Sequence, residues 1–298
     1  MNDTFWEDLA NIPTLSEAEA IHRPDGGRFY PSLIAAEFDG FRPLMIDLTL
    51  PPGSGPHPVV LYIHGGGWVI GSPKITNATL LRFDPFERIV GAGYALARVS
   101  YRLVNEARFP AQIHDVLACI RYVRAKADRF GLDAARLAVL GESAGGYLAL
   151  MAGLAGEAFA GEVGVKGQSS GVQAVVNWYG VTDLLTIAEQ GHADGRPQDP
   201  GARPPAERLL GRASDPELVR YASPISHISA TAPPVLTQHG TADRLVPFAQ
   251  ALQLHKAMTA AGARHHLDPI EGADHCFWNA QDTGLMNRML GFLGTALS

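Results

Sequence analysis

Short apolar runs alternate along the chain with stretches whose apolar residues recur at helical spacing. The run 59–63 (VVLYI) is apolar at every position, which is typical of a strand buried on both faces of a parallel sheet. Alternate residues of 44–50 are apolar instead, which predicts a half-buried, antiparallel edge strand. The other strands that we expect are at 95–100, 137–140, 172–178, 235–238 and 266–270.

Helices are expected between these strands, at 113–123, 147–154, 247–261 and 285–297. Such alternation predicts the α/β class, with a mostly parallel central sheet and helices on both faces. We expect one domain over 1–298, preceded by an N-terminal extension over about 1–33. No clear strand interrupts 183–228, and 191–205 holds three glycines and four prolines, so we expect a helical or loop insertion that acts as a lid.

Composition narrows the function classes. Hydrophobic residues make up 46% of the 298 residues and charged residues 18%, which excludes disorder of the whole chain. The formal net charge of −6 argues against nucleic acid as a partner. No apolar run reaches the roughly 20 residues of a membrane span, and the acidic start MNDTFWEDLA is unlike a secretory signal. We therefore expect a cytoplasmic protein. The chain has only two cysteines and thus no disulfide framework, which agrees with a reducing compartment. The sequence does not determine the oligomeric state and is compatible with a homo-oligomer.

The strongest chemical signal is the segment 141–146, GESAGG, which matches G-x-S-x-G between a predicted strand and a predicted helix. A serine on so sharp a turn needs glycine two residues to either side, because side chains there would collide. The turn exposes the hydroxyl at the helix N-terminus, where free N–H groups stabilise negative charge. Ser143 is therefore the candidate nucleophile, and a glycine-rich turn with a surface serine is the simpler alternative.

A second glycine-rich segment, HGGGW at 64–68, follows the buried run 59–63. Loops of this type supply backbone donors for an oxyanion in lipases and esterases. We predict Gly66, Gly67 and Ala144 as these donors, and we interpret His64 as a structural brace of the loop. A phosphate-binding loop is excluded, since neither G-x-G-x-x-G nor the Walker pattern fits the segment.

A serine hydroxyl needs a general base, and the base needs an orienting acid. Enzymes with this serine turn carry the acid and then the histidine further along the chain. His275 lies in a loop after the last predicted strand, and Asp243 lies just past the strand 235–238. Asp274 competes with Asp243, but neighbouring side chains on a loop rarely meet in hydrogen-bonding geometry. The sequence thus predicts Ser143, Asp243 and His275 as the catalytic residues.

Three aromatic residues at strand ends are candidates for binding substrate: Trp68, Trp178 and Tyr179. Each of them is equally well interpreted as a core residue. The chain holds no HExxH, CxxC or EF-hand pattern, so we expect no metal and no cofactor.

Taken together, these segments resemble the serine esterases of the α/β-hydrolase superfamily. The chain is similar to the branch that holds bifunctional feruloyl and acetyl xylan esterases, near the hormone-sensitive-lipase-like carboxylesterases. The matching segments are HGGGW, SYRL, FPAQIHDV, GLDAARLAVLGESAGGYLAL, NWYGVTDL, YASPISHI, HGTADRLVP and GADH. The resemblance implies an α/β-hydrolase fold, the triad Ser143, Asp243 and His275, and a helical insertion matching 183–228.

We accordingly expect a carboxylesterase that hydrolyses small to medium acyl esters through an acyl-enzyme intermediate. Its partner is a small-molecule ester, and the acyl and alcohol specificity stays open. Two alternatives remain: an amide-cleaving enzyme such as an arylformamidase or small peptidase, and a non-catalytic protein that keeps the fold to bind a ligand.

Overall fold

The computed structural model describes residues 19–193, 203–211 and 215–298. In these ranges one sheet holds nine strands in the order β1-β2-β3-β5-β4-β6-β7-β8-β9. The pairs from β1 to β5 are antiparallel and those from β5 to β9 are parallel. The strands are β1 (Ile21–His22), β2 (Arg28–Phe38), β3 (Phe41–Leu50), β4 (His57–Ile63), β5 (Ala95–Val99), β6 (Leu132–Glu142), β7 (Ala174–Trp178), β8 (Val235–Gly240) and β9 (His265–Ile270).

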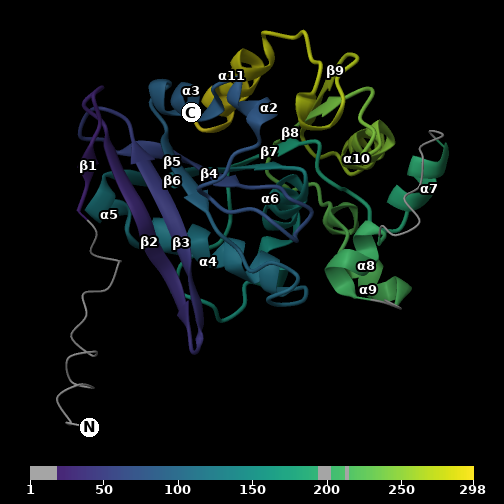
Figure 1. Ribbon diagram of the computed structural model, residues 1–298, viewed down its shortest axis with the longest axis horizontal. Coiled ribbons are helices and arrows are strands. Elements are labelled where there is room, and N and C mark those ends of the chain that lie inside the picture. Colours follow the sequence, from purple (N-terminus) through teal and green to yellow (C-terminus); the bar gives the residue numbers. More distant parts are fainter. Residues whose placement is uncertain (1–18, 194–202, 212–214) are drawn as a thin grey trace.

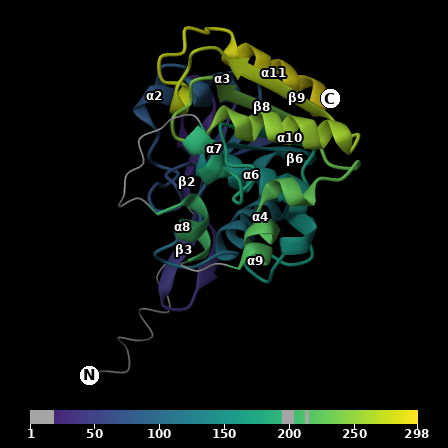
Figure 2. The same ribbon diagram turned by 90° about the vertical axis from the view of Figure 1, so that its right-hand side faces the viewer.

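Helices cover both faces of this sheet, with α3 and α11 on one face and α4 and α6 on the other (Figures 1 and 2). In the described ranges the helices are α2 (Ala78–Leu81), α3 (Pro85–Gly91), α4 (Ala111–Ala125), α5 (Ala127–Phe130), α6 (Ala144–Ala155), α7 (Ile187–Ala193), α8 (Pro205–Leu210), α9 (Pro216–Tyr221), α10 (Phe248–Ala260) and α11 (Leu285–Ala296), with short 3₁₀ turns η2 (Gly156–Phe159), η3 (Pro224–His227) and η4 (His275–Phe277).

The central strand β4 shows why its sequence is apolar throughout. Val59, Leu61 and Ile63 join the core that contains α4 and α6, whereas Val60 and Tyr62 join the core that contains α3 and α11. Both faces of β4 are therefore buried, as the unbroken run predicts. The predicted α/β architecture is confirmed, and each predicted central strand and helix overlaps an observed one.

The start of the sheet differs from the sequence-based prediction. The strands β1 and β2 were not expected, and β2 covers part of the predicted N-terminal extension. Consequently β3 lies between β2 and β5, so the expectation of an edge strand at 44–50 is wrong. The register jumps from Tyr30 opposite Leu48 to Leu33 opposite Ile46, which places one extra residue on β2. This bulge breaks the period-2 pattern by which a strand is recognised.

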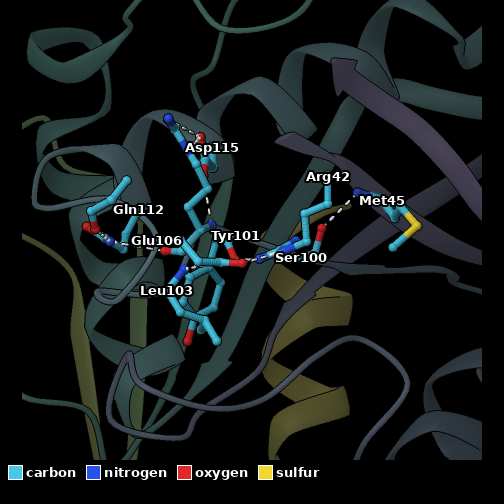
Figure 3. A network of polar contacts seen from close by, with 10 residues as sticks. Arg42, Met45, Ser100, Tyr101, Leu103, Glu106, Gln112 and Asp115 are labelled. Carbon is cyan, nitrogen blue, oxygen red and sulfur yellow. Dashed lines mark hydrogen bonds and ion pairs between the residues drawn. The ribbon is translucent and has the colours of Figure 1, made fainter. Parts of the chain in front are cut away.

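The connection from β5 to α4 is held by charged side chains (Figure 3). Arg42 of β3 binds both carboxylate oxygens of Glu106, at 2.7 and 2.6 Å, and Glu106 also accepts a hydrogen bond from the backbone of Leu103. Asp115, fully buried on α4, accepts bonds from the backbone and guanidinium of Arg102. A bidentate pair of this kind fixes orientation, so the connection is rigid next to the loop 64–68.

The predicted insertion 183–228 contains α7, α8, α9 and η3 in its described parts. Residues 194–202 and 212–214 of the insertion, and residues 1–18 of the predicted N-terminal extension, lie outside the described residues. The insertion is anchored through Gln250 of α10, whose side-chain oxygen accepts hydrogen bonds from the backbone of Thr182 and Asp183, each at 2.8 Å. Its first residues are therefore fixed to the main body of the domain.

Candidate active site

Ser143 occupies a strained turn between β6 and α6. Its backbone has φ 54° and ψ −117°, a conformation that L-residues rarely adopt. A Cβ atom on Gly141 would stand 2.0 Å from the carbonyl oxygen of Gly145, and one on Gly145 would stand 2.0 Å from that of Ile63. Only glycine fits at either place, which is the physical reason for the G-x-S-x-G spacing.

The structure brings the three predicted side chains together at the carboxyl ends of the parallel strands. His275 Nε2 lies 3.0 Å from Ser143 Oγ, and His275 Nδ1 lies 2.8 Å from Asp243 Oδ2. Ser143 follows β6, Asp243 follows β8 and His275 follows β9. Parallel strands place their carboxyl ends at one edge of a sheet, so residues far apart in the chain meet there.

Asp243 is buried and held by several donors. Its Oδ1 accepts hydrogen bonds from the backbone N–H groups of Leu245 and Val246, both at 2.8 Å. His239 Nε2 lies 3.3 Å from Oδ2. Burial works to raise the pKa of Asp243, but the hydrogen bonds from His239 and His275 outweigh it and hold the pKa well below its usual value. The carboxylate is therefore ionised at neutral pH.

Asp274, the competing acid, has a different role. Its carboxylate accepts hydrogen bonds from the backbone N–H groups of Arg244 and His275, at 2.8 and 2.7 Å, and forms an ion pair with the Arg244 side chain. It thereby caps the turn η4 that carries His275. The imidazole is oriented by Asp243 and packs against the ring of Tyr179, with the centroids 4.9 Å apart.

The loop 64–68 lies beside Ser143, with Gly66, Gly67 and Trp68 lining the same cavity. Gly66 and Gly67 have φ of 107° and 60°, and a Cβ on Gly66 would stand 2.1 Å from the carbonyl oxygen of Ile70. Among the described residues, the N–H groups of Gly66 and Gly67 donate to no protein acceptor. Ala144 is the first residue of α6, where helix N–H groups lack a partner within the helix. These three donors line one cavity with Ser143.

Two buried side chains brace this loop. The ring of His64 stacks on Tyr101, whose hydroxyl donates to the His64 carbonyl oxygen at 3.1 Å, and burial lowers the pKa of His64 to about 4. The neutral imidazole is thus a structural brace, as the sequence indicates. Glu142 accepts a hydrogen bond from the N–H of Gly65 at 2.9 Å, and burial raises the pKa of Glu142.

The cavity above Ser143 has a volume of about 600 Å³. Trp68 is part of its lining, although only 2% of Trp68 is exposed. Trp178 and Tyr179 are not among the described residues that line it. Trp178 is buried with its indole N–H donating to Gln238 at 2.8 Å, so its place is structural. The ring of Tyr179 packs against that of His275, so Tyr179 supports the proposed base.

Several lining residues were not predicted from the sequence. Arg203 and Arg208 come from the insertion, while Cys276 and Asn77 meet near His275, where the Asn77 amide donates to the Cys276 thiol at 3.0 Å. No motif marks these positions, so nothing in the sequence identifies them. Within the described residues, no group of three His, Cys, Asp or Glu side chains is arranged to hold a metal ion.

A mostly parallel sheet with a serine on the tight turn between β6 and α6 defines this chain as an α/β-hydrolase fold. The sequence model of the BD-FAE family matches residues 46–258, so the chain belongs to this family. None of the helices in the described ranges combines the length and apolar character needed to cross a membrane.

Named relatives are esterases. Esterase LipC of Mycobacterium tuberculosis is 33% identical over 231 residues, which cover 73% of this chain and 55% of LipC. The chain spans about half the length of LipC and of two further curated esterases that it matches. Among solved structures, a thermophilic esterase from Thermogutta terrifontis with bound propionate is 26% identical at a TM-score of 0.69, covering 95% of this chain and 94% of that one. A bifunctional GH43-CE protein from Bacteroides eggerthii is 27% identical at a TM-score of 0.75, covering 93% of this chain and 39% of that one.

Proposed function

We propose that this protein is a serine carboxylesterase that hydrolyses small to medium acyl esters through an acyl-enzyme intermediate. The observation that carries the proposal is the continuous path of hydrogen-bonding contacts from Ser143 Oγ through His275 to Asp243, with distances of 3.0 and 2.8 Å. Both contacts are short enough for direct proton transfer or orientation of the imidazole. Esterase relatives and the propionate bound to the Thermogutta enzyme support an acyl ester as the substrate.

The reaction begins with neutral His275, whose Nδ1–H donates to Asp243. Nε2 accepts the proton of Ser143 as the hydroxyl oxygen attacks the ester carbonyl carbon. The resulting imidazolium is stabilised by the ionised carboxylate, which the backbone donors of Leu245 and Val246 hold in place.

Negative charge then develops on the carbonyl oxygen. We assign its binding to the N–H groups of Gly66, Gly67 and Ala144, which are fixed before substrate arrives and so cost no reorganisation. His275 next gives its proton to the leaving alcohol. A water molecule, activated by the same imidazole, attacks the acyl-enzyme and releases the acid and Ser143.

The test is hydrolysis of p-nitrophenyl acetate by the Ser143→Ala variant. We expect kcat to fall by a factor of about 10⁴ or more. Ser226→Ala removes an exposed hydroxyl and serves as the matched control. A fluorophosphonate should add once, at Ser143, as read by peptide mass. Full activity of Ser143→Ala would refute the assignment, and faster cleavage of N-formylkynurenine or aminoacyl anilides would favour the amide-cleaving alternative.

A further inference from the structure

Arg208 of α8 forms part of the wall that faces Ser143. Its Nη1 lies 2.7 Å from the point where a Cβ atom would stand on Gly67, and both residues line the cavity of Ser143. Because Gly67 is a proposed oxyanion donor, the guanidinium lies beside the loop that we assign to binding the substrate carbonyl oxygen. Figures 1 and 2 show α8 in the insertion, outside the sheet.

The charge of Arg208 is not neutralised by the protein in the described ranges. Its Nη2 makes one long hydrogen bond, of 3.4 Å, to the carbonyl oxygen of Arg203, and no described carboxylate pairs with it. Arg244 lines the same cavity but is paired with Asp274, at 2.5 Å. Arg208 is half-buried. A partly desolvated guanidinium is stabilised by an anion. A ligand that places an anion beside Arg208 should therefore bind more tightly.

No other charged group among the described lining residues supplies an anion that pairs with Arg208. Arg203 adds a second cation to its wall, and Glu142 is the one acid among the described lining residues. The carboxylate of Glu142 is buried and bound to the N–H of Gly65. The cavity therefore has a cationic side, formed by Arg203 and Arg208, in a chain whose formal net charge is −6.

The placement of Arg208 also distinguishes the two halves of an ester. His275 must give its proton to the leaving alcohol, so the alcohol lies at His275. A second cavity of about 1050 Å³ shares His275 with the first but is not lined by Gly67 or Arg208. The alcohol can extend into that second cavity, and the acyl chain remains beside Gly67 and Arg208.

We propose that Arg208 is a specificity-determining residue that selects esters whose acyl chain carries a carboxylate, that is, monoesters of dicarboxylic acids. This inference rests on the proposed esterase function and adds a substrate class to it. A planar guanidinium can bind a carboxylate through two parallel N–H···O bonds, which gives the acyl chain a fixed orientation.

The test compares mono-p-nitrophenyl adipate with p-nitrophenyl hexanoate, which has the same chain length and no charge. We expect the ratio of their kcat/KM values to fall about tenfold or more in Arg208→Gln, and to be partly retained in Arg208→Lys. Arg220→Gln, which removes an exposed arginine from α9 outside the lining residues, is the matched control and should leave the ratio unchanged.

An unchanged ratio in Arg208→Gln, or an equal loss for both esters, would overturn the proposal while leaving the esterase function intact. A second measurement does not depend on turnover: calorimetry of monomethyl adipate binding to Ser143→Ala protein. The dissociation constant should rise about tenfold when Arg208→Gln is added, and an unchanged constant would also overturn the proposal. Hydrolysis of neither ester, with binding that still depends on Arg208, would instead refute the esterase function.

Discussion

The carboxylate of Glu142 is joined to the backbone N–H of Gly65 by a hydrogen bond of 2.9 Å. This bond connects the residue before the proposed nucleophile to the first glycine of the oxyanion loop, across 77 positions of the chain. The two halves of the proposed catalytic machinery are thereby held in one position relative to each other. Glu142 occupies a position at which the G-x-S-x-G pattern allows any residue, and in this protein it has a structural role.

Replacing Glu142 by Ala should lower both kcat and stability. The change leaves the buried N–H of Gly65 without an acceptor, at a cost of about 1–3 kcal/mol. Glu142→Gln keeps an oxygen that can accept the bond, so it should retain more activity than the alanine variant. Steady-state kinetics and urea unfolding of both variants check this. Equal kcat in the two variants would contradict a positioning role for the bond.

The Asp243→Asn variant should fold and yet lose about 10⁴-fold in kcat at neutral pH. An amide at this place can donate to Nδ1 and so favours the wrong tautomer of His275. Asp274→Asn is the comparison variant, because Asp274 binds the backbone N–H of His275 and the exposed Arg244, whereas the ring nitrogen Nδ1 of His275 contacts Asp243. Its kcat should fall far less. A comparable loss in both variants would shift the assignment of the acid toward Asp274.

Gly145→Ala should destabilise the fold by more than about 2 kcal/mol, because the new methyl group would stand 2.0 Å from the carbonyl oxygen of Ile63. Gly91→Ala, at the end of α3, meets no atom within 4 Å and should be neutral or slightly stabilising. Thermal unfolding of both variants measures the contrast. Equal melting temperatures would show that the turn relaxes more easily than its packing indicates.

Stability should fall as the pH drops below about 6.5, and His265 should contribute to that fall. Burial, together with the charges of His255 and His266, lowers the pKa of His265 from 6.5 to about 3. Between these two values the unfolded chain binds a proton that the folded chain does not. The free energy of unfolding therefore rises with pH across this window, by up to about 1.4 kcal/mol per pH unit for this group.

The variant His265→Gln should reduce that slope, whereas His22→Gln, which removes an exposed histidine on β1, should change it less. Urea unfolding at several pH values between 4 and 7 gives the slopes. If His265→Gln leaves the slope unchanged, its imidazole is accessible to protons in the folded state.

The sequence predicts the fold best at positions where a single physical constraint determines which residue types are allowed. The apolar run in β4 reflects burial on both faces, and the glycines at 141 and 145 reflect backbone clashes that no side chain tolerates. Such demands fix residue types at fixed spacing. In β2, by contrast, the bulge after Tyr30 offsets the alternation, so the pattern is lost although the strand forms.

Within the site, the same distinction separates Ser143 from Arg208. The serine is tied to its neighbours by the turn, so local sequence identifies it. Arg208 reaches the site only because the insertion folds against the loop 64–68, a tertiary contact that leaves no local pattern. Trp178 shows the reverse case: its position at a strand end favours a pocket, but the indole is buried against Gln238.

The proposed nucleophile and its base are 132 positions apart, and the base follows the last strand of the sheet. During synthesis, a nascent chain that has emerged only through β8 contains Ser143 but not the imidazole of His275, which we propose as its base. We therefore expect ester hydrolysis to begin only once β9 has paired with β8 and the loop that carries His275 has reached Ser143. Turnover of a chromogenic ester would then indicate that the sheet is complete.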